Sequence, residues 1–316
     1  MPLSNLFHDR TARAFAFASA LIALWAWKGP LTKHNHASQQ LVRHEWKQCA
    51  DVVFVGDSTV RQGIYAGIVE HALGDTYRVA NFGYPTQAIV DDDYLTSAEA
   101  VLDPSNPDRS LVISVSSWNT SVIAAHAYRK EGTELAQRSP SAELDWREAL
   151  DVHTASRGLC GLLWNACPWR TERALGRGGQ LVLDQWRDDE TREVPATLAY
   201  FDGKPHAFPP ETIEPLYARV RELLQRGVHV FAYVERDRPL IAPITEAHGY
   251  DPNRIEQRLR ETGAIVLEFP TDLPTRDGTH MTRAAAQRWS AAVGTALAAA
   301  LPRHDHIAPT RCAWPE

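Results

Sequence analysis

A serine, an aspartate and a histidine occupy positions in this chain that suit acyl transfer. Ser58 follows Gly56 and Asp57 at the end of an apolar, β-branched run, and Asp277 and His280 stand three residues apart just before a long Ala-rich stretch. A serine hydroxyl becomes nucleophilic when a base removes its proton, and a third group orients that base. The pattern therefore predicts His280 as the base of Ser58 and Asp277 as the group that holds the imidazole. A serine after a strand is also common as a structural helix N-cap.

Two further residues are candidates for stabilising the charge of an acyl-transfer intermediate. Gly83 ends a second β-rich run, and Asn119 follows a third. Backbone N–H groups and asparagine amides are typical donors of an oxyanion hole. The predicted oxyanion hole consists of the Ser58 N–H, the Gly83 N–H and the Asn119 side chain. The alternative is that both residues belong to ordinary turns.

Short β-rich runs alternate with helical patterns along most of the chain, which is typical of a parallel sheet covered on both faces. Strands are predicted at residues 50–55, 77–82, 110–116, 228–234 and 264–269, and helices at 60–73, 87–102, 210–226, 252–262 and 281–301. The predicted fold class is α/β, a flavodoxin-like three-layer sandwich with a central five-stranded parallel sheet. In such sheets the functional residues lie beyond the carboxyl ends of the strands. The candidates above all fall there.

The segment from about 121 to 205 lacks this alternation and contains Cys160, Cys167 and several tryptophans. We interpret it as an insertion after the third strand, within a catalytic domain of residues 49–301 that is followed by a tail at 302–316. Long excursions inside compact domains are usually functional. Tryptophan faces stack well on sugar rings, although they also serve in cores and at membrane interfaces.

The first 30 residues differ from the rest of the chain. A basic region at 1–13 precedes an apolar run that ends near residue 30, and 31–48 form a linker. We predict an uncleaved membrane anchor at 14–30, with the basic region inside and the body exported. A cleaved signal peptide is the alternative.

The cysteine count agrees with export, because disulfides persist in oxidising compartments. Cys49 lies at the amino end of the first predicted strand, where an antiparallel last helix would also bring Cys312. We therefore predict the disulfides Cys49–Cys312 and Cys160–Cys167. Four unrelated thiols are the alternative.

The net charge, the remaining histidines and one charged run do not indicate a further function. The net charge of −6 and the pI near 6.1 give no basic surface for nucleic acid. The histidine pairs outside the predicted core lack a metal-ligand pattern. The charged run 235–238 after the fourth strand is either part of a pocket or a surface loop.

These residues together resemble the SGNH (GDSL-like) hydrolase superfamily, whose four motifs supply Ser, Gly, Asn and His. Here the matching motifs are Gly56-Asp57-Ser58, Gly83, Asn119 and Asp277-Gly278-Thr279-His280, and they span most of residues 50–301. The usual Gly-x-Asn-Asp motif is replaced by Ser117-Trp118-Asn119-Thr120. The resemblance implies an α/β sandwich that needs no metal or organic cofactor.

The layout of one N-terminal anchor and an exported body also resembles bacterial alginate-acetylation and teichoic-acid D-alanylation proteins. This implies a periplasmic, single-pass O-acyltransferase of the inner membrane that modifies a glycan or polysaccharide. Its acyl donor would come from a membrane-bound O-acyltransferase. The alternatives are an O-acyl esterase with the same triad and a catalytically inactive assembly subunit.

Overall fold

A computed structural model describes residues 48–83, 92–121, 173–175, 181–183, 207–237, 239, 241–268, 273–275 and 279–301. The predicted membrane anchor, most of the predicted insertion, the tail and Asp277 lie outside these residues. Among the helices of the described part, none is both long enough and apolar enough to cross a membrane.

A five-stranded parallel sheet forms the centre of the described structure, with strand order β2-β1-β3-β6-β7. Its strands are β1 (Val52–Val55), β2 (Val79–Asn81), β3 (Ser110–Val115), β6 (His229–Val234) and β7 (Ile265–Val266). Every residue of β1 and β3 is buried, as expected for strands covered on both faces. In the register, Val53 of β1 lies beside Ala80 and Leu111. The predicted α/β architecture with five parallel strands is confirmed.

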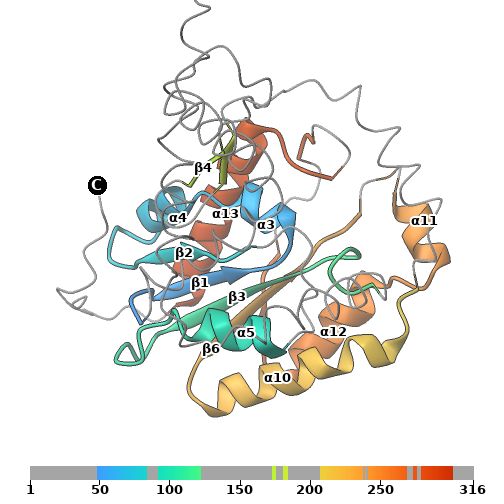
Figure 1. The fold of residues 1–316 in the computed structure, drawn as a ribbon, viewed down its shortest axis with the longest axis horizontal. Coiled ribbons are helices and arrows are strands. Elements are labelled where there is room, and N and C mark those ends of the chain that lie inside the picture. Colours follow the sequence, from blue (N-terminus) through green and yellow to red (C-terminus); the bar gives the residue numbers. More distant parts are fainter. Residues whose placement is uncertain are drawn as a thin grey trace, which may run out of the picture.

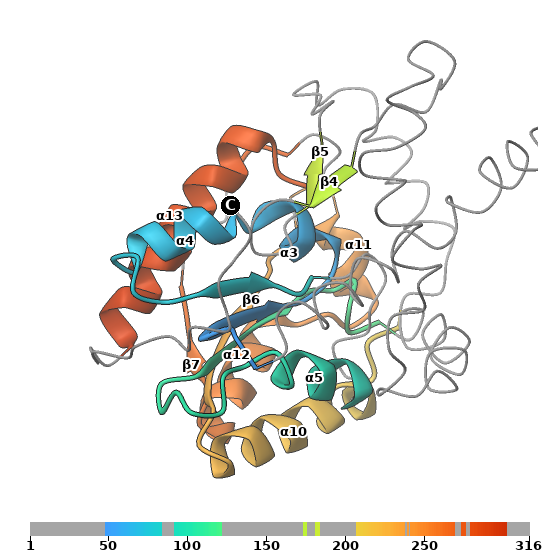
Figure 2. The same cartoon turned by 60° about the vertical axis from the view of Figure 1, so that its left-hand side comes forward.

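Helices cover both faces of this sheet (Figures 1 and 2). One layer consists of α3 (Ser58–Gly63), α4 (Ala66–Ala72) and α13 (Arg283–Ala300), and the other of α5 (Asp92–Glu99), α10 (Glu214–Gln225) and α12 (Pro252–Thr262). Each layer packs its own hydrophobic core against the sheet. Because every strand is parallel, all five carboxyl ends lie at one edge, where α3 begins.

The predicted helix 60–73 is in fact two helices, α3 and α4, separated by an extended residue at Ile64. The break is stabilised by α13, because the Ser290 hydroxyl accepts from the Tyr65 N–H at 2.9 Å and lies 3.0 Å from the Gly63 carbonyl oxygen. A residue 225 positions away therefore determines the break. The sequence period near Ile64 carries no sign of it.

Three further elements were not predicted: α11 (Ala242–Ala247), and an antiparallel pair formed by β4 (Arg173–Leu175) and β5 (Leu181–Leu183) within the predicted insertion. The predicted helix 210–226 is divided into the short 3-10 helix η3 (Pro210–Thr212) and α10. Three-residue strands lie below the length at which alternation is recognisable.

The contact between α13 and α4 gives a stability prediction with a built-in control. A Cβ added to Gly294 of α13 would lie 2.6 Å from the Ala72 Cβ and 3.2 Å from the Val69 Cα, whereas at Gly67 of α4 it would meet nothing within 4 Å. We expect Gly294→Ala to lower the free energy of unfolding by about 1 kcal/mol or more, because overpacking costs ~1–3 kcal/mol and outweighs the helix propensity gained.

We expect Gly67→Ala to raise it by about 0.5–1 kcal/mol, since only the propensity changes. Urea unfolding of both variants measures the difference. If both substitutions raised the free energy of unfolding by the same amount, α4 and α13 would be able to move apart at no cost.

Candidate active site

The structure brings Ser58 and His280 into direct contact. The His280 Nε2 lies 2.7 Å from the Ser58 Oγ, although the two residues are 222 positions apart. Ser58 is the first residue of α3, directly beyond the carboxyl end of β1, and His280 precedes α13. Both residues are partly exposed. A nucleophile and its base are thus within hydrogen-bond reach and open to a substrate.

The loop that carries His280 is closed by backbone contacts on both of its sides. Thr275 and Met281 form an isolated antiparallel bridge, and the Thr282 N–H donates to the Pro274 carbonyl at 3.0 Å. Thr282 then caps α13 by accepting from the Ala285 N–H. The loop is therefore fixed at both ends around the histidine. Asp277 belongs to this loop but lies outside the described residues, so its contact with His280 stays a prediction.

The turn before Ser58 is held by its own side chain and by α5. Asp57 is the N-cap of α3 and accepts from the Thr59 N–H at 2.8 Å. The buried Tyr94 hydroxyl lies 3.0 Å from the Gly56 nitrogen and 2.6 Å from the Phe82 carbonyl oxygen. It therefore ties the ends of β1 and β2 together directly behind the nucleophile.

Asn81, at the end of β2, is a positioning residue that we did not predict. Its buried side-chain amide donates to the Val60 carbonyl at 2.9 Å and to the Ile64 carbonyl at 2.8 Å, while its Oδ1 accepts from the Gly83 N–H at 3.0 Å. The Val60 carbonyl also accepts from the N–H of the C-cap residue Ile64, so the Asn81 amide adds a second donor there and supplies a partner for the Ile64 carbonyl. Asn81 therefore fixes α3 from the end opposite Ser58.

Gly83 has a structural reason to be glycine. A Cβ at this position would lie within 3.0 Å of the backbone of Val60 and Arg61, so only glycine lets the end of β2 approach α3 this closely. Its N–H is engaged by Asn81, as described above. In this arrangement the predicted oxyanion-hole donor holds the turn after β2.

Asn119 has a structural role in the turn after β3. Asn119 is completely buried, its Nδ2 donates to the Ser114 carbonyl at 2.9 Å and its Oδ1 accepts from the Ser116 N–H at 2.9 Å. The Asn119 N–H also donates to the Ser116 hydroxyl, which in turn donates to the Asp57 carboxylate at 2.5 Å. The amide is thus enclosed in its own turn, where the Asn119 backbone orients a hydroxyl that supports Asp57, and its part in an oxyanion hole stays a prediction.

The third predicted oxyanion donor is the Ser58 N–H. Among the described residues it has no hydrogen-bond acceptor, which is the condition that an oxyanion donor must meet in the absence of substrate.

Two further carboxyl groups, those of Glu235 and Asp237, lie close to Asp57 of the nucleophile turn. Glu235 and Asp237 follow β6, so the charged run after the fourth predicted strand does lie at the site edge. Burial raises the pKa of Glu235 to about 8, and the nearby Asp57 charge adds to the shift. Burial also raises the pKa of Asp237, against the opposing effect of hydrogen bonds from Thr245 and Ser117.

Hydroxyl groups rather than cations contact these carboxyl groups. Within the described residues no ion pair involves any of the three. Arg236, which stands between Glu235 and Asp237 in the sequence, directs its guanidinium to Glu256 and Asn253. Among the described residues there is also no group of three or more His, Cys, Asp or Glu side chains that would hold a metal ion.

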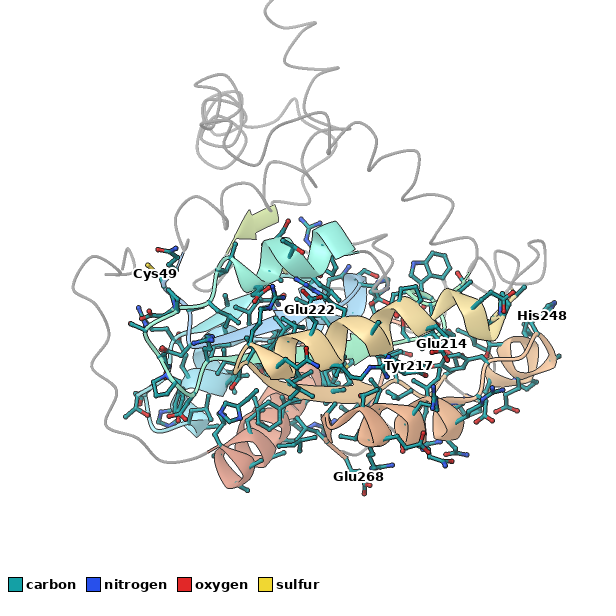
Figure 3. All side chains as sticks on the ribbon, turned by 90° about the horizontal axis from the view of Figure 1, so that it is seen from below. Cys49, Glu214, Tyr217, Glu222, His248 and Glu268 are labelled. Atoms are coloured by element: carbon teal, nitrogen blue, oxygen red, sulfur yellow. The ribbon has the colours of Figure 1, made fainter. Side chains whose placement is uncertain are left out.

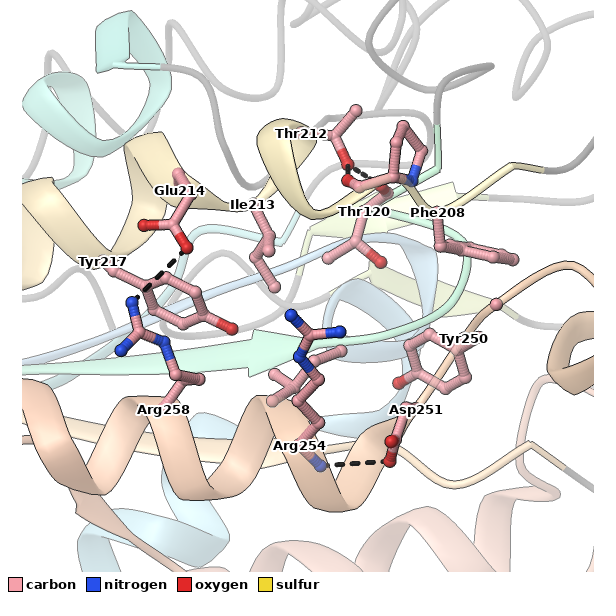
Figure 4. A pocket seen from close by; sticks show the side chains of 13 residues that line it. Thr120, Phe208, Thr212, Ile213, Glu214, Tyr217, Tyr250, Asp251, Arg254 and Arg258 are labelled. Carbon is pink, nitrogen blue, oxygen red and sulfur yellow. Dashed lines mark hydrogen bonds and ion pairs between the residues drawn. The ribbon is translucent and has the colours of Figure 1, made fainter.

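A small cavity of about 60 Å³ lies between α10 and α12, and Figure 4 shows its side chains. Phe208 packs against Tyr250 with ring centroids 5.3 Å apart, and the Arg258 guanidinium lies 5.4 Å from the Tyr217 ring centre. The lining includes neither Ser58 nor His280. The cavity is also far below the ~300–1,000 Å³ of typical ligand pockets. It carries no functional assignment.

Cys49 is disulfide-bonded. It lies just before β1, at the opposite end of the described structure from His248, which follows α11 (Figure 3). The other cysteines, Cys160, Cys167 and Cys312, lie outside the described residues. The predicted pairing of Cys49 with Cys312 therefore stays a prediction, although Cys49 is not a free thiol.

No known protein family, no curated protein and no solved structure matched the chain.

Proposed function

We propose that this chain is a serine acyl-ester enzyme of the SGNH type that transfers an O-acyl group to a glycan or polysaccharide outside the cytoplasm. The observation that carries the proposal is the 2.7 Å contact between His280 Nε2 and Ser58 Oγ. In support, the sheet is parallel, Ser58 follows its first strand, and His280 precedes the last helix, which is the arrangement that the SGNH resemblance implies.

The mechanism follows from the chemistry of this pair. His280 accepts the Ser58 proton as Oγ attacks the carbonyl carbon of an acyl ester, and the negative charge develops on the carbonyl oxygen near the Ser58 N–H. His280 then returns the proton to the leaving alcohol, which leaves an acyl-Ser58 ester. An acceptor hydroxyl, deprotonated by His280, attacks that ester and regenerates Ser58. Asp277 is proposed to hold the other imidazole nitrogen.

The same residues serve two outcomes. Water as the acceptor makes the chain an esterase, whereas a sugar hydroxyl makes it a transferase. The predicted N-terminal anchor and the tryptophan-containing insertion favour a polymeric glycan acceptor. The disulfide at Cys49 favours an oxidising, extracytoplasmic location. A partner that delivers the acyl group across the membrane, of the membrane-bound O-acyltransferase class, belongs to the same proposal.

An inactive assembly subunit is the competing proposal, and the contact between Ser58 and His280 argues against it. A scaffold has no need to keep a partly exposed serine hydroxyl on a histidine nitrogen while the residues behind it are buried.

The test uses the exported body, residues 38–316, with its disulfides formed and p-nitrophenyl acetate as acyl donor. We expect release of p-nitrophenol, a serine-reactive phosphonate probe attached to Ser58, and acetylated sugar when an oligosaccharide is added. Turnover without acetylated sugar would select the esterase. No turnover and no label on Ser58 would reject the serine mechanism in favour of the assembly subunit.

A further inference from the structure

The Thr59 hydroxyl lies between two carboxyl groups that belong to different parts of the chain. Its Oγ1 is 2.7 Å from the Asp57 Oδ1 and 2.5 Å from the Glu235 Oε1. A hydroxyl has one hydrogen, so it donates to one carboxylate only. If both carboxyl groups were anions, the Thr59 hydrogen would lie between Oγ1 and one carboxylate oxygen, and no hydrogen would lie between Oγ1 and the other carboxylate oxygen. The arrangement therefore needs one more proton than two ionised carboxyl groups supply.

The surroundings of the two carboxyl groups indicate which one carries that proton. Asp57 is completely buried and accepts from the Thr59 N–H at 2.8 Å and from the Ser116 hydroxyl at 2.5 Å, in addition to the Thr59 hydroxyl. Such a set of donors suits a carboxylate anion. The Glu235 carboxyl group, among the described residues, contacts only the hydroxyls of Thr59 and Ser114, both at 2.5 Å. The raised pKa of Glu235, about 8, agrees with a neutral carboxyl group at this position.

We propose that Glu235 is a positioning residue that stays protonated at neutral pH and donates to the Thr59 hydroxyl, which donates to Asp57. Glu235 then donates to Thr59, Thr59 donates to Asp57, and Asp57 caps the helix that begins at Ser58. Glu235 does not touch the reacting atoms. It connects the end of β6 to the nucleophile turn, and this role rests on the proposed serine mechanism.

Loss of that proton would disturb the turn. Asp57 and an ionised Glu235 would both place a negatively charged oxygen against the Thr59 hydroxyl oxygen. Two like charges that share one contact atom repel strongly in a poorly hydrated site. Among the described residues, the other ionisable groups that face Glu235 are Asp237 and the tyrosines Tyr233 and Tyr250. None of them supplies a compensating positive charge, and burial raises the pKa of both tyrosines well above its usual value, which keeps them neutral.

The decisive variant is Glu235→Gln, because a glutamine amide has two hydrogens and can donate to the Thr59 and Ser114 hydroxyls without titrating. In the wild type we expect kcat to fall as pH rises through about 8, where Glu235 ionises. In Glu235→Gln we expect near-normal kcat at neutral pH and no such fall up to ~pH 9, because the amide stays neutral. Glu268→Gln is the matched control, because its side chain is exposed and it should keep the wild-type profile.

A second readout is independent of any activity. The folded chain keeps the Glu235 proton up to about pH 8, whereas the unfolded chain releases it near the ordinary pKa of 4.5. The stability of the wild type relative to Glu235→Gln should therefore be greatest below pH 4.5, fall with the slope of one proton as pH rises to about 8, and level off above. Urea unfolding of both proteins across this range measures the slope.

The outcomes separate this inference from the proposed function. A flat stability difference, or an alkaline fall in kcat that persists in Glu235→Gln, would overturn the shared proton while leaving the serine mechanism intact. Loss of activity at neutral pH in a stable Glu235→Gln would also overturn it, since that result requires an anion at Glu235. Absence of ester turnover in the wild type would reject the proposed function, and the unfolding slope would still test the proton.

Discussion

Ser58→Ala and His280→Ala are each expected to lower kcat for p-nitrophenyl acetate by at least ~10³-fold, and the double variant is expected to lose no more than either one alone. The 2.7 Å contact makes the two side chains a single chemical unit. Without the hydroxyl there is nothing to acylate, and without the imidazole the hydroxyl keeps its proton. Removing the second member of a unit that no longer works therefore costs little. Steady-state rates of the three variants, corrected for spontaneous ester hydrolysis, provide the measurement.

The control for the histidine is His71→Ala. His71 lies on α4, its side chain is 85% exposed, and it contacts only Asp75 at 3.2 Å among the described residues. We expect its kcat to equal that of the wild type. If instead the losses from Ser58→Ala and His280→Ala multiplied in the double variant, the two residues would act independently. The observed contact would then not be the catalytic one.

The sheet and the pairing of nucleophile with base were both predictable from the sequence, for related reasons. Strands that are buried on both faces have continuous apolar sequences, so β1 and β3 could be recognised without any knowledge of the neighbouring strands. Parallel strands also share one carboxyl edge, which placed Ser58 near the loop that carries His280. Chain order and strand polarity were enough to bring these two residues together.

The supporting residues were not predictable, because residue type does not reveal where a donor points. Asn119 and Gly83 are capable oxyanion donors by type, but in the structure their hydrogens are directed to Ser114 and Asn81. Glu235 contacts Thr59 across 176 residues and Ser114 across 121, contacts that no local pattern encodes. The signal that existed was positional, since Glu235 follows a buried strand at the same edge as Ser58.

Replacement of Asn81 by leucine is expected to impair both folding and the nucleophile. Asn81 is 2% exposed, and its amide serves the carbonyls of Val60 and Ile64 together with the Gly83 N–H. Leucine has a similar volume and no polar atoms, so the Ile64 carbonyl and the Gly83 N–H lose the partner that Asn81 supplies, while the Val60 carbonyl keeps the Ile64 N–H. Each buried group left unsatisfied costs ~1–3 kcal/mol, so we expect a loss of about 2 kcal/mol or more in the free energy of unfolding.

The effect on the nucleophile is separable from the effect on stability by comparison with Asn106→Leu. Asn106 is equally buried, and its amide donates to Asp51 at 2.7 Å while its Oδ1 accepts from the Asp108 N–H. It precedes β3, at the amino edge of the sheet, away from Ser58.

Both variants, Asn81→Leu and Asn106→Leu, should therefore be destabilised. Only Asn81→Leu should also label more slowly with the serine-reactive probe under conditions where the protein is fully folded, because only Asn81 fixes α3. Equal labelling rates in the two folded variants would show that α3 keeps Ser58 in place without Asn81, and that the support comes from Asp57 and the residues around it.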